Sequence, residues 1–203
     1  MSRIPARSLS ADCNSQFIEI FGDVDKNNKN YIKLPIAEVC EELFAGGDKP
    51  IDNSQERTEE YKYPVFSNGE GERGLLCFSK EYRVAEEAIT ISARGAVGYS
   101  AIRSPFFTPV VRLLTVVPKT CVDIIFLKHC IDASTLVGTG SSQGQLTLPE
   151  FKKLFVLVPP LDLQKQFAAF VRQTDKSKYN GYRTIIGLID LISFISNERS
   201  ISQ

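Results

Sequence analysis

The chain has 203 residues, of which 43% are hydrophobic and 24% charged, and its basic and acidic residues balance to a formal net charge of zero. This is the composition of an ordinary globular protein, and the balanced charge argues against a generic basic coat for nucleic acid, although a local basic face stays compatible with it. The most apolar run, Ile185 to Ile195, is too short to cross a membrane and contains Asp190, so we expect no membrane association.

The cysteines and the N-terminus predict a cytoplasmic protein. The five cysteines are widely spaced and form no CxxC pair, which is typical of reduced thiols. Residues 2–12 are polar and basic and lack the apolar run of a signal peptide.

The N-terminal part is predicted to contain two helices. Residues 14–21 place four apolar side chains on one broad helical face, and Gly22 follows as a C-terminal stop. A charged, Asn-rich linker is expected over 23–30. Apolar residues at helical spacing over 36–43 predict a second, short amphipathic helix, which Gly46-Gly47 ends.

The middle of the chain is predicted to be mostly strands, separated by glycines, prolines and polar turns. The expected strands are 63–66, 74–78, 88–92, 99–102 and 110–117. Residues 122–131 predict a helix whose apolar side chains face inward. Strands in the middle and helices at both ends indicate an α+β fold: a mostly antiparallel, twisted sheet or partial barrel, flanked by helices.

A distinctive order of segments begins at Gly138. A Gly/Ser-rich loop leads to a short helical turn with Pro149 in an opening position and Glu150 in its first turn. A buried strand is expected over 154–158, Pro159-Pro160 ends it, and an amphipathic helix follows over 162–178.

This order resembles a junction in the specificity (S) subunits of type I restriction-modification enzymes, where a DNA target-recognition domain meets a long helix. The resemblance lies in Leu148–Leu154, Val158–Leu161 and Gln164–Gln166, preceded by Gly138–Ser142. Residues 14–21 look like the end of the central helix of such subunits. Tyr63–Gly69, Arg73-Gly74, Ile89–Gly95, Gly98 and Phe126-Leu127 extend the resemblance, which covers about residues 16–171.

The resemblance implies a domain order and a function. Residues 1–30 are the N-terminal helix and linker, 31–160 the target-recognition domain, and 161–203 a conserved-region helix with an atypical apolar tail. The implied function is sequence-specific binding of double-stranded DNA, reading one half of a split target without chemistry or a cofactor of its own. The implied partners are modification (methyltransferase) subunits and, through them, the restriction subunit. A homodimer of such halves would read an interrupted palindrome.

Polar side chains in the glycine-rich loops are the candidate DNA contacts. Arginine pairs with guanine, asparagine or glutamine with adenine, and lysine, arginine and hydroxyl groups hold phosphates. The candidates are Lys49, Ser67, Asn68, Arg73, Arg94, Tyr99, Arg103, Ser104, Ser141, Ser142 and Gln143. Taken alone these residues fit ordinary solvated loops; the resemblance assigns them to DNA as a set.

Apolar residues near the C-terminus are the candidate subunit interface. They are Leu163, Phe167, Phe170, Val171, Leu188 and Ile192. The sequence departs from the family pattern at Tyr179–Tyr182, which weakens the helix, and in the charge-poor tail that follows. An alternative function is therefore a protein-interaction module that oligomerises without DNA affinity.

A nucleotide-dependent enzyme is the other alternative, because Gly69 to Gly74 matches GxGxxG after a strand. The residues after it are strand-like, so no helix N-terminus would hold a phosphate there. His129 is the only histidine and lies in an apolar helix, so we expect a packed or surface imidazole and not a ligand or catalytic group. A multi-histidine metal centre is excluded, and we expect no catalytic residues and no metal.

Overall fold

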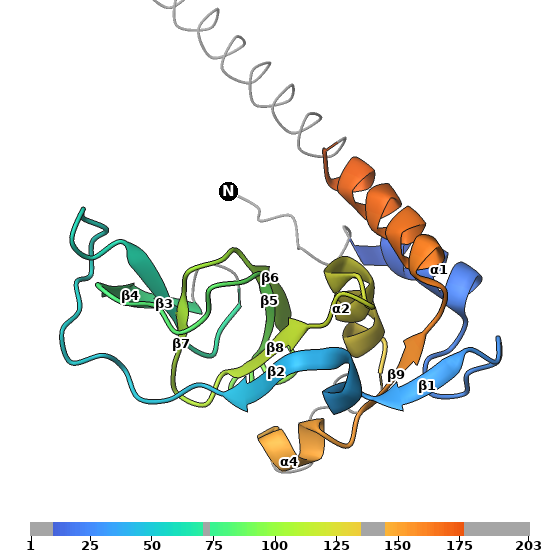
Figure 1. Cartoon of the computed structure of the whole chain (residues 1–203), viewed down its shortest axis with the longest axis horizontal. Helices are drawn as coiled ribbons and strands as arrows, with labels where there is room; N and C mark the ends of the chain where they lie inside the picture. The colour runs from blue at the N-terminus through green and yellow to red at the C-terminus, as the bar shows by residue number, and fades with distance from the viewer. Residues whose placement is uncertain (1–9, 71–73, 135–144, 177–203) are drawn as a thin grey trace, which may run out of the picture. The chain divides into compact units, whose positions relative to one another are not determined.

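The computed structural model describes residues 10–70, 74–134 and 145–176 (Figure 1). The chain divides into two compact units, Met1–Lys165 and Gln166–Gln203. Among the described residues, the first unit contains all of the strands. No helix in the described part of the chain is both long and apolar enough to span a membrane.

A four-stranded antiparallel sheet forms the centre of the first unit. Its order is β2-β8-β5-β6, from strands β2 (Cys40–Ala45), β8 (Leu114–Pro118), β5 (Ala88–Ile91) and β6 (Ser100–Arg103). Every residue of β5 is buried, because other parts of the unit cover both faces of that strand. The central sheet is therefore a rigid support for the loops at its ends.

A second, three-stranded sheet lies beside the central one (Figure 1). Its order is β4-β3-β7, from β4 (Leu75–Ser79), β3 (Tyr63–Phe66) and β7 (Thr108–Pro109). Phe107 and Val117 are buried in one core cluster, against which Phe44 and Phe66 pack. The two sheets thus share apolar residues and hold each other in place.

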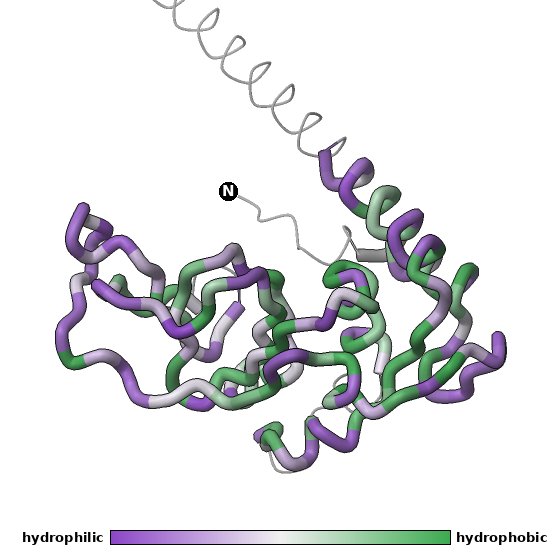
Figure 2. The backbone as a smooth tube through the Cα atoms, in the orientation of Figure 1, coloured by the Kyte–Doolittle hydropathy of each residue, from purple (hydrophilic) through white to green (hydrophobic). Residues whose placement is uncertain are grey.

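A two-stranded ribbon and two longer helices pack around these sheets in the first unit. Strand β1 (Ile32–Pro35) pairs antiparallel with β9 (Phe155–Val158). Helix α2 (Ile124–Asp132) contacts β5, β6 and β9, and helix α1 (Ser10–Phe21) places Phe17 and Phe21 against Phe126, with ring centroids 5.7 and 4.7 Å apart. Figure 2 shows the hydrophobic residues gathered in α2 and the central strands.

Side-chain hydrogen bonds fix the ends of several elements. Asp123 caps α2 by accepting from the amides of Ile125 and Phe126. The buried side chain of Gln164 accepts from the Asp123 amide at 2.9 Å and donates to the Pro159 carbonyl at 2.8 Å. Helix α4 (Leu148–Phe151) begins with a capping box between Thr147 and Glu150.

The α+β prediction and most of the strand predictions are confirmed, and two predictions of local structure are wrong. Residues 36–43 form a 3₁₀ helix, η2 (Ile36–Val39), followed by β2, because pairing with β8 draws the chain into a strand from Cys40. The strand expected over 110–117 begins only at Leu114, because Val111 and Arg112 have positive φ angles of 53° and 60°.

The remaining helix predictions hold where the structure describes them. The last described helix covers residues 161–176, close to the expected 162–178. Of the two positions expected for His129, packed or at the surface, the structure shows the packed one, with its ring centroid 6.2 Å from that of Phe17. All five cysteines are free thiols, and burial raises the pKa of Cys40 and Cys130 to about 12.

Candidate nucleic-acid interface

Three loops leave the central sheet at the end where β5 finishes. Ile91 pairs with Ser100 on β6 and with Leu114 on β8, and Leu114 pairs in turn with Ala45 on β2. The segments 46–47, 92–99 and 110–113 therefore meet at one end of the sheet. We call these three segments the loop end.

Asn68 ties the turn after β3 to two of these loops. Its Nδ2 donates to the Val111 carbonyl at 2.7 Å, and its Oδ1 accepts from the Ala93 amide, also at 2.7 Å. The Gly69 amide adds a bond to the Ser92 hydroxyl at 3.1 Å. The asparagine predicted to contact DNA thus already uses both atoms of its amide within the chain.

The turn that precedes β8 has an unusual backbone. Val111 and Arg112, with φ angles of 53° and 60°, occupy the left-handed region that glycine and asparagine favour. Their amides donate to the carbonyls of Gly47 at 2.8 Å and Gly46 at 3.0 Å. A side chain on Gly46 would lie only 2.6 Å from the backbone of Pro109, so glycine is required there. The side chains of Val111 and Arg112 are both exposed.

Two arginines supply positive charge to the loop end. Arg94 is exposed beside Gln145, with which it forms an isolated antiparallel bridge. Arg112 lines a cavity of about 280 Å³ together with Gln145. Within the described part of the chain, neither arginine has an ion-pair partner.

Three carboxylates lie near these arginines in the described part of the chain, and one of them, Asp48, is exposed directly after Gly47. Glu70 is exposed in the turn after Asn68. The carboxylate of Glu150 accepts from the Thr147 hydroxyl at 2.7 Å and the Thr147 amide at 2.9 Å, and these bonds lower the pKa of Glu150 below its usual value.

Arg103 has a role inside the fold. Its Nε donates to the Thr90 hydroxyl at 3.1 Å, and its guanidinium lies 4.0 Å from the centre of the Phe66 ring. Burial lowers the pKa of the guanidinium. The arginine therefore joins the two sheets.

The structure brings together some of the predicted DNA contacts and separates others. Asn68, Arg94 and Tyr99 lie at or against the loop end, Ser67 immediately precedes Asn68, and Lys49 is exposed two residues after Gly47. Ser104 lies at the opposite end of β5, because its neighbour Arg103 pairs with Ala88. Arg73, Ser141, Ser142 and Gln143 lie outside the described residues.

Sequence reasoning missed Val111 and Arg112. Both lie near the start of the strand expected over 110–117, where an arginine interrupts a mostly apolar run. That interruption is the one sequence signal that could have marked a turn.

The predicted subunit-interface residues differ in exposure. Phe167 and Val171 are buried, Leu163 is partly buried, and Phe170 is 37% exposed. Leu188 and Ile192 lie outside the described residues.

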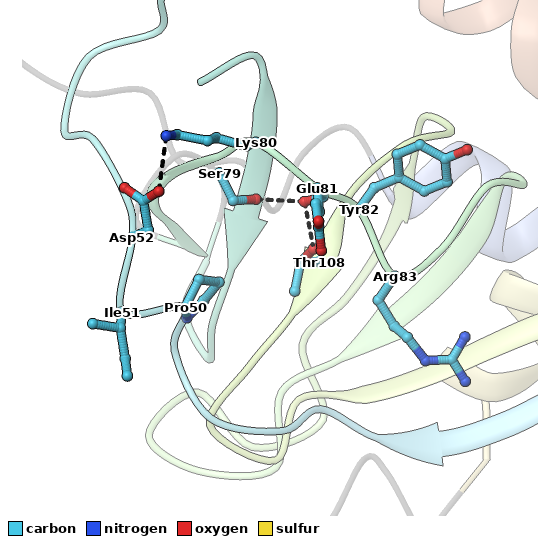
Figure 3. A pocket seen from close by; sticks show the side chains of 9 residues that line it. All are labelled: Pro50, Ile51, Asp52, Ser79, Lys80, Glu81, Tyr82, Arg83 and Thr108. Carbon is cyan, nitrogen blue, oxygen red and sulfur yellow. Dashed lines mark hydrogen bonds and ion pairs between the residues drawn. The ribbon is translucent and has the colours of Figure 1, made fainter. Parts of the chain in front are cut away.

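A larger cavity, of about 540 Å³, lies near the second sheet (Figure 3). Both of its basic residues are paired: Lys80 Nζ is 2.9 Å from Asp52 and 2.7 Å from Glu60, and Arg83 is 3.2 Å from Glu42. The hydroxyls of Ser79 and Thr108 donate to the Glu81 carbonyl. The two carboxylates offset the positive charge of Lys80, so this cavity attracts a phosphate only weakly.

The alternative of a nucleotide site at Gly69–Gly74 gains no support from the geometry. Residues 71–73 lie outside the described residues, and the last glycine, Gly74, directly precedes strand β4 and not a helix whose N-terminus could hold a phosphate. Among the described residues, no group of three or more His, Cys, Asp or Glu side chains could hold a metal ion.

Comparisons with known proteins agree on one family. A family model described as the type I restriction modification DNA specificity domain matches residues 18–184. Two putative type I specificity subunits of Mycoplasma pneumoniae are 41% and 36% identical to this chain, over 72% and 70% of its length. The matches cover 43% and 39% of those relatives, so the chain spans less than half of their length.

Solved structures share the fold. The HsdS subunit from Thermoanaerobacter tengcongensis superposes with a TM-score of 0.61 at 17% identity, covering 84% of this chain and 44% of that subunit. The type I S subunit from M. genitalium gives a TM-score of 0.61 at 16% identity, covering 92% of this chain and 53% of that one.

Proposed function

The chain belongs to the family of type I restriction-modification DNA specificity domains, and from that membership we propose that it recognises a short sequence in double-stranded DNA. The observation that carries the proposal is the loop end, where three loops and two arginines meet on one rigid sheet. An arginine can read guanine through two parallel hydrogen bonds, and flanking loops can hold phosphates.

We propose that residues 31–160 are the target-recognition domain, between an N-terminal helix and linker (1–30) and a C-terminal helical region (161–203). The pairing of β1 with β9 supports these limits, because it joins residue 32 to residue 158 and closes the segment on itself. A chain with one such domain reads one half of a split target.

We assign DNA contact to the exposed polar residues of the loop end and to the predicted residues near it. Arg94 is assigned to a phosphate, because it is exposed and has no ion-pair partner within the described residues. Lys49, Tyr99 and Ser67 stay candidates, as do Arg73, Ser141, Ser142 and Gln143. Ser104 is the weakest candidate, because it lies away from the loop end.

The proposed protein partners are modification subunits, which carry out methyl transfer, and through them the restriction subunit. The chain itself contributes recognition only. Phe170, more than a third exposed, is the apolar side chain of the 161–176 helix that we expect a partner to cover.

Co-expression with modification subunits, followed by mapping of methylated bases in genomic DNA, tests this proposal. We expect methylation at one defined sequence with the unchanged chain and with Arg57→Ala, a control at an exposed arginine outside the loop end. We expect Arg94→Ala to weaken methylation at all sites of that sequence. Oligomerisation with no methylation and no DNA affinity would favour the interaction module instead.

A further inference from the structure

We infer that Arg112 reads a guanine, that the strained turn carrying it exists to present it, and that Asn68 positions this turn rather than reading a base. The inference rests on the proposed function and names the residue that determines specificity at one base pair.

The backbone of the turn motivates the inference. Two-residue turns in which both residues have positive φ normally contain Asn-Gly or a similar pair. Here the pair is Val111-Arg112, and valine, with its branched Cβ, is among the residues least suited to this conformation. Strain of this kind persists only where the surroundings enforce it, and it gathers at functional sites.

The surroundings do enforce it. The amides of Val111 and Arg112 are bound by the carbonyls of Gly47 and Gly46, and the carbonyl of Val111 is bound by Asn68. The tight contact of Gly46 with the Pro109 backbone fixes the position of the partner segment. Each of these bonds uses a backbone group of the turn, so both side chains stay available to a ligand.

The chemistry of the exposed residue indicates the ligand. Arg112 makes no ion pair or side-chain hydrogen bond within the described residues, so its guanidinium can donate to O6 and N7 of a guanine in the major groove. Lysine could supply the charge but not the two parallel bonds. Asn68 cannot read adenine in the same way without giving up its bonds to Val111 and Ala93.

Selection from a random duplex pool with the full chain tests the inference. The variant Arg112→Gly suits the positive φ and should unfold at an equal or higher temperature than the unchanged chain. We expect it to enrich the same sequence except at one G·C pair, where preference falls roughly 5- to 150-fold. Arg112→Lys should lose the same preference, whereas Arg57→Ala should lose none.

Asn68 is tested in the same selection. We expect Asn68→Ala to weaken the preference for the same G·C pair. The double variant with Arg112→Gly should weaken that preference no further than Arg112→Gly alone. If Asn68 served only the stability of the fold, Asn68→Ala would lower the affinity for DNA without changing the preference at that pair. If Asn68 contacted a base directly, the variant would weaken the preference for an A·T pair instead.

The possible failures are distinct. If the unchanged chain enriches no sequence, the DNA-recognition proposal falls and the inference with it. If the unchanged chain enriches a sequence that Arg112→Gly retains in full, only the inference is overturned.

Discussion

Individual side chains show how residue type can suggest one role and the fold assign another. Arg103 and Asn68 both belong to the residue types that read bases, and both lie in loop-rich sequence. In the structure, Arg103 stacks on Phe66 and donates to Thr90, while Asn68 bridges Val111 and Ala93. Asn68 and Val111 are 43 residues apart in the sequence, so no local pattern could predict that bond.

Arg103 should therefore matter for stability more than its neighbour. We expect Arg103→Ala to lower the free energy of unfolding by about 1–3 kcal/mol, because it removes a hydrogen bond within the central sheet and a cation–π contact between the two sheets. The adjacent exposed Ser104→Ala should change it by less than about 0.5 kcal/mol. Urea unfolding of both variants checks this, and equal stabilities would contradict the role given to Arg103.

The capping box at α4 predicts a dependence on pH. The hydroxyl and amide of Thr147 bind the ionised Glu150 and hold its pKa below the usual 4.5, so the folded state favours the ionised form. Its stabilisation is present above that usual value and is lost as the pH falls through the lowered pKa of the folded state. Glu150→Gln keeps a capping side chain and should remove this part of the dependence.

Thermal unfolding of both proteins across the acid range measures the effect. The unchanged chain should lose stability relative to Glu150→Gln as the pH falls. Parallel curves for the two proteins would show that the capping carboxylate makes no contribution.

Among the elements, the strands with an unbroken apolar or β-branched pattern were predictable, and those decided by distant partners were not. Residues 63–66 and 88–91 form strands where the sequence indicates them. Apolar spacing over 36–43 fits a helix equally well, and the pairing of residues 40–45 with 114–118 decides for a strand. Within the candidate site, the loop that contains Arg94 was predictable from the sequence. Arg112 was not, because its apolar neighbours favour a strand.

The junction of β2 with the turn before β8 offers a matched pair of glycines. A Cβ on Gly46 would lie 2.6 Å from the Pro109 backbone, whereas a Cβ on Gly47 would meet no atom within 4 Å. We expect Gly46→Ala to lower the free energy of unfolding by about 1–3 kcal/mol, since backbone must move. Gly47→Ala should change it by less than about 0.5 kcal/mol.

Chemical unfolding of the two alanine variants distinguishes a specific contact from a general demand for flexibility. Similar losses from Gly46→Ala and Gly47→Ala would contradict the close approach of β2 to the turn. A loss confined to Gly46→Ala would also predict altered DNA selection, because the same contact holds the turn that carries Arg112.

At the scale of the whole molecule, the proposed recognition domain is a segment whose first and last strands pair with each other. β1 and β9 join the two limits of residues 32–158, while the loops that carry Arg94 and Arg112 leave a different sheet, the central one. This construction lets the loops vary without disturbing the ribbon.

With zero net charge, the chain depends on local cations, so its DNA binding should weaken with salt by a log–log slope of roughly −0.9 for each neutralised phosphate.

The central claim is that the loop end distinguishes one DNA sequence from others. Its most direct test is the affinity of the full chain for the enriched duplex and for a shuffled duplex of equal length and composition, at one fixed salt concentration. We predict a preference of about 10³-fold or more for the enriched duplex. Equal affinity for the two duplexes would contradict the account.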